Sequence, residues 1–365
     1  MRLEVEAALV GGSFVPGEVE IVDGLIARYG LAGRNGGGRG VAVPGFIDLQ
    51  VNGFGGVDFL DADAAGYRRA GEALLETGVT SFLPTLITAP VDDLLSALAE
   101  VPRNGVVPRV LGVHLEGPFL AASRLGTHPS LGRRDPDVTV LERLLDAGPV
   151  RVMTLAPELP GALELIDVLR RRGIVVSCGH SDATAEQADA AFDRGAGTVT
   201  HLFNAMRPLS HRDPGIVGAA LVREDVIVQI IADGVHLAPA TILLVWRAAA
   251  GRVALVTDSV AAASADAGSY SLGSVELSVR DGAARAPDGV LAGSVETMIE
   301  GVRHVHALGV PLADALDAAT RVPAEVLALE HAGRLEPGMP ADVVVLDDNL
   351  EIESVFVGGE ARVLA

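Results

Sequence analysis

The segment GIVVSCGHSDATAEQADAAFDRGAGTVTH, residues 173–201, contains two short apolar runs separated by a helical pattern. Both runs are rich in β-branched residues, and each ends in a histidine, His180 and His201. The spacing of apolar residues over 184–194 predicts an amphipathic helix between the two runs. A strand, a helix and a second strand in this order predict a β-α-β unit with parallel strands.

The same alternation continues on both sides of this segment. Helical patterns lie between the apolar runs at 64–76, 92–100, 160–172 and 238–250. The apolar runs span residues 41–48, 79–87, 109–116, 150–156, 173–180, 197–201, 226–233 and 252–258. Eight buried strands alternating with helices predict a parallel sheet, most economically a (β/α)8 barrel. A doubly wound sheet is the alternative, but no glycine-rich dinucleotide-binding motif follows the first run.

The two ends of the chain differ from its middle. Residues 1–43 alternate apolar and polar positions and contain a hairpin signal at Asp23-Gly24. Residues 335–365 have the same character, with short apolar runs joined by turns. We therefore expect an α/β fold with two domains. A TIM-like (β/α)8 barrel would span 44–334, and both termini would form a small composite β domain.

Composition and charge exclude several classes of protein. The chain has 365 residues, 49% of them apolar, which is enough to fold around a large core. Its formal net charge of −20 disfavours binding to nucleic acid or to an anionic membrane. The one cysteine, Cys178, cannot form an intrachain disulfide. Neither a signal peptide nor a transmembrane segment is predicted, so we expect a cytoplasmic protein.

Several predicted strands end in a residue that can bind a metal or carry a proton. In a (β/α)8 barrel these strand ends surround the active site. Glu116, His180 and His201 offer one carboxylate and two imidazoles, the donor set of a catalytic zinc site with one open position. A lone histidine is more often a hydrogen-bonded core residue, but a Glu ending an apolar strand is seldom unpaired. The three residues together predict a metal site.

Two further groups are candidates for catalysis and binding. Asp258 ends the eighth run, where its carboxylate could accept a proton from a metal-activated water, although a turn-capping role fits equally well. The polar segment 204–215 is too long for a tight connection and contains His211-Arg212, a positive group suited to a phosphate or carboxylate. A solvated surface loop is the alternative interpretation of this segment.

Six motifs occur along the chain in this order: HLEGPF (114–119), GHSDAT (179–184), THLFNAM (200–206), ADGVH (232–236), VTD (256–258) and LAGS (291–294). Together with PGFID (44–48), they resemble the motifs of the N-acetylglucosamine-6-phosphate deacetylase family, within the amidohydrolase superfamily. The resemblance covers nearly the whole chain. THLFNAM and HLEGP are its most discriminating parts, and PGFID is generic.

This resemblance implies a role for each matching position. Asp258 would be the catalytic acid and base, and His128 would polarise the acetyl carbonyl. Arg212 would bind substrate from its own or from a neighbouring subunit. The implied metal ligands are Glu116, His180 and His201. The implied substrate-binding residues are Thr127, His128, Asn204, Ala205, Arg212, His236, Leu291, Ala292 and Gly293.

The end of the first barrel strand departs from many amidohydrolases, which have His-x-His there and bind a second metal. This chain has Asp48-Leu-Gln-Val-Asn52. Because residues i and i+2 of a strand share a face, Gln50 and Asn52 occupy the histidine positions. Neutral amides are poor ligands for zinc or iron. We therefore expect one divalent metal ion, with zinc favoured and iron as the alternative.

The resemblance implies metal-dependent deacetylation of N-acetyl-D-glucosamine 6-phosphate to D-glucosamine 6-phosphate and acetate. Four alternatives stay open: the galacto epimer as substrate, a different amide, an iron oxygenase and a non-catalytic sugar-phosphate sensor. A homodimer or a higher even homo-oligomer is also implied. Hairpin signals within 264–289 predict a lid over the sugar.

Overall fold

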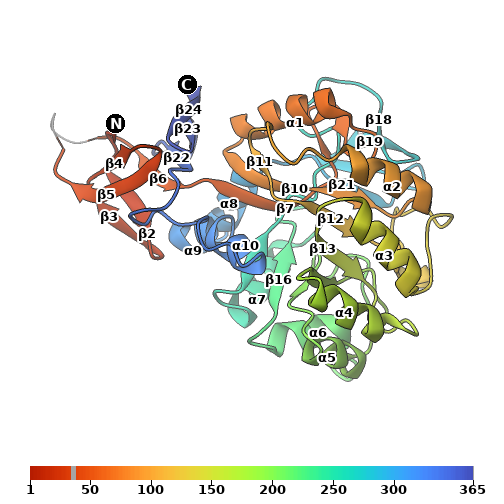
Figure 1. The fold of residues 1–365 in the computed structure, drawn as a ribbon. Helices are drawn as coiled ribbons and strands as arrows, with labels where there is room; N and C mark the ends of the chain where they lie inside the picture. The colour runs from red at the N-terminus through yellow and green to blue at the C-terminus, as the bar shows by residue number, and fades with distance from the viewer. Residues whose placement is uncertain (34–37, 365) are drawn as a thin grey trace.

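The computed structural model describes residues 1–33 and 38–364, and its larger part is a barrel of parallel strands (Figure 1). The barrel strands, in order around the sheet, are β7 (Phe46–Val51), β10 (Val79–Ile87), β12 (Val113–Glu116), β13 (Val150–Leu155), β14 (Val175–Cys178), β15 (Thr198–Val199), β16 (Ile227–Ile230) and β17 (Val253–Leu255). Short β11 (Arg109–Val110) pairs with the start of β10. The predicted (β/α)8 barrel is confirmed.

The barrel is closed between its first and last strands. At the C-terminal end, the backbone N–H of Asp258 donates to the carbonyl of Gln50 over 2.9 Å. Further down, the two strands are joined through a connecting segment. The carbonyls of Ala318 and Ala319 accept hydrogen bonds from β17 and β7. The site residues on both strands are therefore fixed relative to one another.

Helices cover the outside of the barrel, and helices overlap all five predicted ranges, 64–76, 92–100, 160–172, 184–194 and 238–250. The helices are α1 (Ala64–Glu76), α2 (Val91–Glu100), α3 (Val138–Ala147), α4 (Ala162–Arg171), α5 (Ala185–Asp193), α6 (Gly215–Val222), α7 (Pro239–Ala248), α8 (Met298–Ala307), α9 (Leu312–Asp317) and α10 (Arg321–Val326), with a short 3-10 turn at Ala122–Arg124. Helix α5 begins with a capping box in which Thr184 and Gln187 bond each other's backbone. This cap explains why the helix starts directly after the His180 turn.

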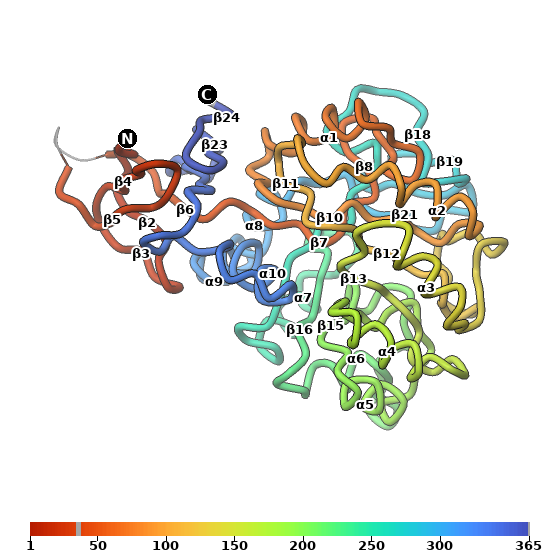
Figure 2. The backbone as a smooth tube through the Cα atoms, in the orientation of Figure 1, coloured from red at the N-terminus to blue at the C-terminus, as the bar shows by residue number. Residues whose placement is uncertain are grey.

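Both chain ends join in a six-stranded sheet beside the barrel, where Figures 1 and 2 show the N- and C-terminal segments together. Its order is β24 (Glu360–Leu364), β23 (Ile352–Val357), β22 (Val343–Leu346), β6 (Val41–Pro44), β2 (Ala7–Val10) and β3 (Ser13–Pro16). A second sheet contains β1 (Arg2–Leu3), β4 (Glu18–Val22) and β5 (Leu25–Leu31). The predicted composite β structure is confirmed, while its exact limits at 43 and 335 stay predictions.

Two smaller strand groups lie near the C-terminal ends of the barrel strands. One is the pair β8 (Gly53–Phe54) and β9 (Val57–Asp58). The other is an antiparallel sheet of β18 (Tyr270–Leu272), β19 (Val275–Arg280), β20 (Ala283–Arg285) and β21 (Leu291–Ser294). We call this second group the lid sheet. Within the described ranges, no helix is long and apolar enough to span a membrane.

Candidate active site

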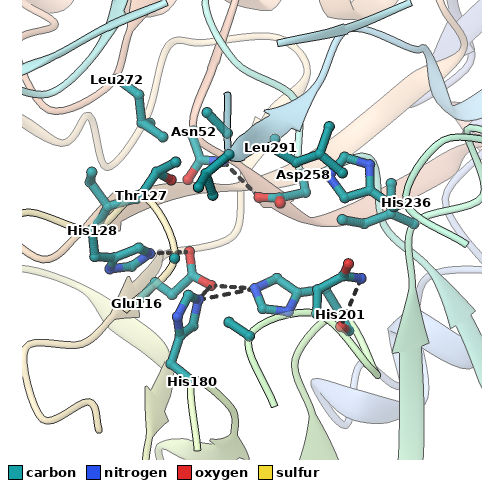
Figure 3. Close-up of a pocket in the computed structure, with 18 residues that line it drawn as sticks. Asn52, Glu116, Thr127, His128, His180, His201, His236, Asp258, Leu272 and Leu291 are labelled. Carbon is teal, nitrogen blue, oxygen red and sulfur yellow. Dashed lines mark hydrogen bonds and ion pairs between the residues drawn. The ribbon is translucent and has the colours of Figure 1, made fainter. Parts of the chain in front are cut away.

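A cavity of about 360 Å³ opens at the C-terminal ends of the barrel strands. The predicted residues that line it are Glu116, Thr127, His128, His180, His201, Asn204, Ala205, His236, Asp258, Leu291, Ala292 and Gly293. They come from strands and loops far apart in the sequence, and Figure 3 shows their side chains converging. One predicted substrate residue is not among them. Arg212 lies exposed on the turn after Ser210, outside the cavity of its own chain.

Glu116, His180 and His201 form a tight buried cluster at the floor of the cavity (Figure 3). The Glu116 Oε1 atom lies 3.1 Å from His180 Nε2 and 2.9 Å from His201 Nε2. The two Nε2 atoms are 3.2 Å apart. Burial alone would raise the pKa of the Glu116 carboxyl, but hydrogen bonds from His128, His180 and His201 hold this pKa well below its usual value. The carboxylate is therefore ionised.

This cluster fits a divalent cation. The Nδ1–H of His180 donates to the carbonyl of Arg124 over 2.8 Å, so Nε2 is the ring atom that faces Glu116 and His201, where a cation could replace its proton. Two imidazole nitrogens and an ionised carboxylate facing one point are the donors of a catalytic zinc or iron site. A backbone carbonyl that orients a ligating histidine is a typical outer partner of such a site.

Two of the clustered residues and the proposed acid-base residue have an uncommon backbone conformation. The φ angles of His180, His201 and Asp258 are +48°, +28° and +49°, in the left-handed region that non-glycine residues rarely adopt. Each residue lies two or three positions after the end of a barrel strand. The positive φ turns the chain sharply and directs the side chain inward over the barrel mouth. Strain of this kind concentrates at functional sites, and it sets these residues apart from ordinary strand ends.

Asp258 is held by the side-chain amides of Gln50 and Asn52, the two residues at the end of the first barrel strand. Its Oδ1 accepts hydrogen bonds from Gln50 Nε2 over 3.0 Å and from Asn52 Nδ2 over 2.7 Å. Burial and the nearby negative charge of Glu116 raise the pKa of Asp258 to about 6. The second oxygen, Oδ2, has no hydrogen-bond partner among the described residues. Sequence reasoning missed this positioning role, although the shared face of Gln50 and Asn52 pointed to it.

Asp48 was one of the polar strand ends, yet it does not line the cavity. Its carboxylate lies below the site, where it accepts a 2.6 Å hydrogen bond from Thr257 Oγ1 and a 3.2 Å bond from the N–H of Gln50. Burial raises the pKa of Asp48 to about 7. Asp48 therefore joins the strand that bears Gln50 to the residue that precedes Asp258.

His128 reaches the cluster from the loop after β12. Its Nε2 lies 3.6 Å from Glu116 Oε2, and the backbone N–H of Thr88 points at its Nδ1 over 3.3 Å. Burial, with the imidazole of His180 close by, lowers the pKa of His128 to about 4, so the ring is neutral. Because a backbone N–H can only donate, Nδ1 accepts and the ring proton lies on Nε2. His128 thus presents a hydrogen-bond donor to the cavity.

Apolar side chains complete the wall, and sequence reasoning did not identify them. Ile87, Ile231, Leu272 and Val290 line the cavity with the predicted residues. Leu272 lies on β18, and Val290 precedes β21, so the lid sheet forms one side of the cavity. Apolar residues in a chain this rich in apolar residues have no distinguishing signal. The expected location of the lid beside the site agrees with this arrangement.

Known proteins are similar to this chain in both fold and sequence. The amidohydrolase family model matches residues 41–362. An N-acetylglucosamine-6-phosphate deacetylase from Homo sapiens is 41% identical over 348 residues, which cover 90% of this chain and 84% of that protein. An N-acetylgalactosamine-6-phosphate deacetylase from Escherichia coli O157:H7 is 37% identical over 325 residues, with 87% and 86% covered.

A solved structure gives the same result. It is the D267A mutant of N-acetyl-D-glucosamine-6-phosphate deacetylase from Mycobacterium smegmatis, in complex with N-acetyl-D-glucosamine-6-phosphate. It superposes with a TM-score of 0.93 at 36% identity and covers 100% of this chain and 99% of that chain. The chain therefore belongs to the amidohydrolase family and, within it, to the N-acetylglucosamine-6-phosphate deacetylases.

Proposed function

We propose that this chain hydrolyses the acetamide of N-acetyl-D-glucosamine 6-phosphate to D-glucosamine 6-phosphate and acetate. The observation that carries this proposal is one buried group of side chains. Glu116, His180 and His201 form a cluster suited to a cation, and Asp258 shares their cavity with one carboxylate oxygen free. The similarity to deacetylases of this substrate supports the same reaction.

Glu116, His180 and His201 would hold one divalent metal ion, zinc or iron. When bound, the metal would supply Lewis-acid polarisation of a water molecule and of the acetyl carbonyl. Gln50 and Asn52 donate to Asp258 with their amide nitrogens. A second metal would need these positions as ligands, and amides bind zinc or iron weakly. One metal ion per chain follows from this.

Asp258 carries the proton. Its Oδ2 accepts a proton from water as the water oxygen bonds to the acetyl carbon. When the bond between that carbon and the amide nitrogen breaks, Asp258 returns the proton to the leaving amine. The hydrogen bonds from Gln50 and Asn52 occupy Oδ1, so Oδ2 alone is left for this transfer.

His128 stabilises the carbonyl oxygen. Its Nε2–H donates a hydrogen bond to the acetyl oxygen, whose negative charge grows as water adds. A preorganised donor of this kind, in a site with little water, is worth about 2.7–4 kcal/mol in other hydrolases. Burial keeps the ring neutral, with its pKa lowered to about 4, and the backbone N–H of Thr88 keeps the proton on Nε2.

The sugar phosphate is bound by Thr127, Asn204, Ala205, His236 and the segment 291–293, with Arg212 supplied by a second copy of the chain. Two features support the exchange of Arg212. The turn that presents it is closed by backbone hydrogen bonds between Ser210 and Asp213, and Arg207 Nη2 holds Asp213 over 2.6 Å. Arg212 is exposed on this turn and does not line the cavity of its own chain, which favours a homodimer or a higher even homo-oligomer.

The galacto epimer of the substrate is a second candidate. The relative from Escherichia coli O157:H7 is named for N-acetylgalactosamine 6-phosphate, and it is nearly as similar to this chain as the others are. A cytoplasmic location stays a prediction from the sequence.

Acetate release by the purified protein tests the proposal. The assay compares N-acetylglucosamine 6-phosphate, its galacto epimer and unphosphorylated N-acetylglucosamine, each with and without a chelator. We expect fast acetate release from N-acetylglucosamine 6-phosphate alone, and we expect the chelator to abolish it. Equal release from the epimer would broaden the substrate class. No release from any of them by metal-loaded protein would overturn the proposal.

A further inference from the structure

The loop after β16 contains a buried pair of charged side chains beside the catalytic group. Asp233 and His236 have only 1% and 4% of their side chains exposed. His236 lines the cavity, and Figure 3 shows its ring next to Asp258. Asp233 does not line this cavity. It lies behind His236, so its influence on bound substrate passes through that ring.

Asp233 makes three hydrogen bonds within its own loop. One carboxylate oxygen, Oδ1, accepts from the backbone N–H groups of Val235 and His236 over 2.9 and 2.8 Å. The other, Oδ2, lies 2.6 Å from His236 Nδ1. The backbone bonds fix the turn, and the third bond fixes the imidazole ring. Both oxygens of Asp233 are therefore used within four residues of chain.

This arrangement determines where the ring proton of His236 lies. Although burial raises it, the hydrogen bonds and charge of His236 leave the pKa of Asp233 below its ordinary value, so the group is a carboxylate. A carboxylate can only accept hydrogen bonds. Nδ1 of His236 must therefore carry a proton, whatever the charge of the ring. Nε2, the atom directed away from Asp233, is then the one left to meet a ligand.

We propose that Asp233 is a positioning residue for substrate binding, which fixes the orientation and the Nδ1–H tautomer of His236 and so presents Nε2 to the sugar phosphate. This inference rests on the proposed function, because it takes the cavity beside Asp258 as the substrate site. It assigns a task to a carboxylate that touches neither substrate nor metal. Outer partners that orient a metal-binding histidine in this way typically change affinity or activity by about 10–100-fold when removed, and we expect the same range for a substrate-binding histidine.

Asp233→Asn is the informative variant. It keeps the shape of the side chain and reverses the direction of the hydrogen bond to His236 Nδ1. The Asn oxygen can still accept from the N–H groups of Val235 and His236. Its amide nitrogen then faces Nδ1 and can only donate. To accept that bond, Nδ1 must give up its proton and Nε2 must carry one, so the atom offered to the substrate becomes a donor.

Steady-state acetate release gives the first readout. We expect Asp233→Asn to lower kcat/KM by about 10–100-fold, with most of the loss in KM. In a His236→Ala background, Asp233→Asn should cause no further loss, because the ring that it positions is gone. Glu296→Gln is the matched control. Glu296 is a neighbouring carboxylate whose pKa is raised to about 7 by burial and by the charge of Asp233, yet it has no hydrogen bond to His236. Its kcat/KM should stay within about twofold of wild type.

Nitrogen-15 NMR of histidine-labelled, zinc-loaded protein gives a readout that does not depend on turnover. The His236 signals are assigned by their loss in His236→Ala. We expect Nδ1 to be protonated in wild type and the proton to lie on Nε2 in Asp233→Asn. An Nε2–H tautomer in wild type, or an equal kinetic loss in the His236→Ala background, would overturn the proposal. If acetate release itself fails, the proposed function falls, while the NMR result still decides the tautomer.

Discussion

Asp258, the proposed proton carrier, depends on neighbouring residues for both its position and its pKa. Gln50 and Asn52 bind one of its oxygens, and the charge of Glu116 together with burial raises its pKa to about 6. A carboxyl group whose pKa lies near the operating pH can both accept and return a proton.

Asp258→Asn should therefore remove the proton transfer while leaving the metal ligands intact. General acid-base catalysis contributes about 10²–10⁴-fold to rate, so kcat should fall by at least that range. The measurement is acetate release together with metal content by atomic absorption. Loss of the metal along with the activity would instead make Asp258 a ligand.

Asp48→Asn tests whether titration of the buried carboxylate beneath the site makes the free energy of unfolding depend on pH. Burial raises the pKa of Asp48 from 3.8 to about 7 in the folded protein. Between these values the folded protein retains a proton that the unfolded chain has released. The free energy of unfolding therefore decreases as pH rises through this range, by up to about 4 kcal/mol.

The amide that replaces the carboxyl group in Asp48→Asn never ionises, so the variant should lack this part of the decrease. Urea unfolding of both proteins from pH 4 to pH 8 measures the difference. We expect the variant to gain stability relative to wild type as pH rises, whereas parallel profiles would show that Asp48 does not titrate here.

Among the elements around the cavity, the edge of the lid sheet is attached to β9 through Asp58, while its other edge joins the barrel through Ser294 of β21. The Oδ2 of Asp58 accepts a 2.6 Å hydrogen bond from the N–H of Gly273, in the turn between β18 and β19. Its Oδ1 accepts from the N–H of Leu60 over 2.9 Å. One half-buried side chain on β9 thus holds the edge of the sheet whose Leu272 lines the cavity.

Asp58→Ala should loosen the lid sheet without reaching the metal cluster. We expect faster hydrogen exchange over 270–280 and a KM increased roughly three- to tenfold, for a bond worth about 1 kcal/mol. Glu276→Ala is the control, because it removes an exposed carboxylate from the same sheet. Unchanged exchange in Asp58→Ala, or equal changes in both variants, would contradict this role.

The strand and helix pattern of the barrel was predictable because each buried strand is short, β-branched and followed by an amphipathic helix. The segment 173–201 is the clearest case, with β14, α5 and β15 where the sequence placed them. The strand ends Glu116, His180, His201 and Asp258 were predictable for the same reason, since barrel topology brings C-terminal strand ends together.

Other features depend on contacts that no local pattern encodes. The junction between β17 and β7 uses backbone carbonyls of Ala318 and Ala319, far along the chain. Asp48 had the character of a site residue, but it shares the face of Gln50 two residues further from the C-terminal end of β7, so its carboxylate bonds Thr257 below the cavity. The lining residues Ile87 and Ile231 resemble many other core residues in composition and burial.

At the scale of the whole molecule, a chain of net charge −20 is proposed to bind an anionic sugar phosphate. Long-range attraction cannot assist this binding, so positive groups must be placed locally. Arg212 is an exposed cation near the site loops, and it does not line the cavity of its own chain. If two copies of the chain exchange Arg212, each cavity receives a positive group from its neighbour.

Mixing two inactive variants tests the exchange. Arg212→Ala retains Asp258, and Asp258→Asn retains Arg212, so a mixed dimer would contain one complete site. Random mixing of equal amounts should restore about a quarter of the wild-type activity. The variants are unfolded, mixed and refolded, with each variant refolded alone as the control. Activity no higher than that of the separate variants would show that Arg212 serves its own chain or none.

Metal titration of metal-free protein tests whether activity requires one metal ion at Glu116, His180 and His201. Zn²⁺ is added stepwise to the apoprotein, and acetate release from N-acetylglucosamine 6-phosphate is measured at each step. We predict that activity rises linearly and reaches its maximum at one equivalent per chain, and that a His180→Ala variant shows no such rise. Full activity without metal, or a maximum only at two equivalents, would contradict a single metal held by Glu116, His180 and His201.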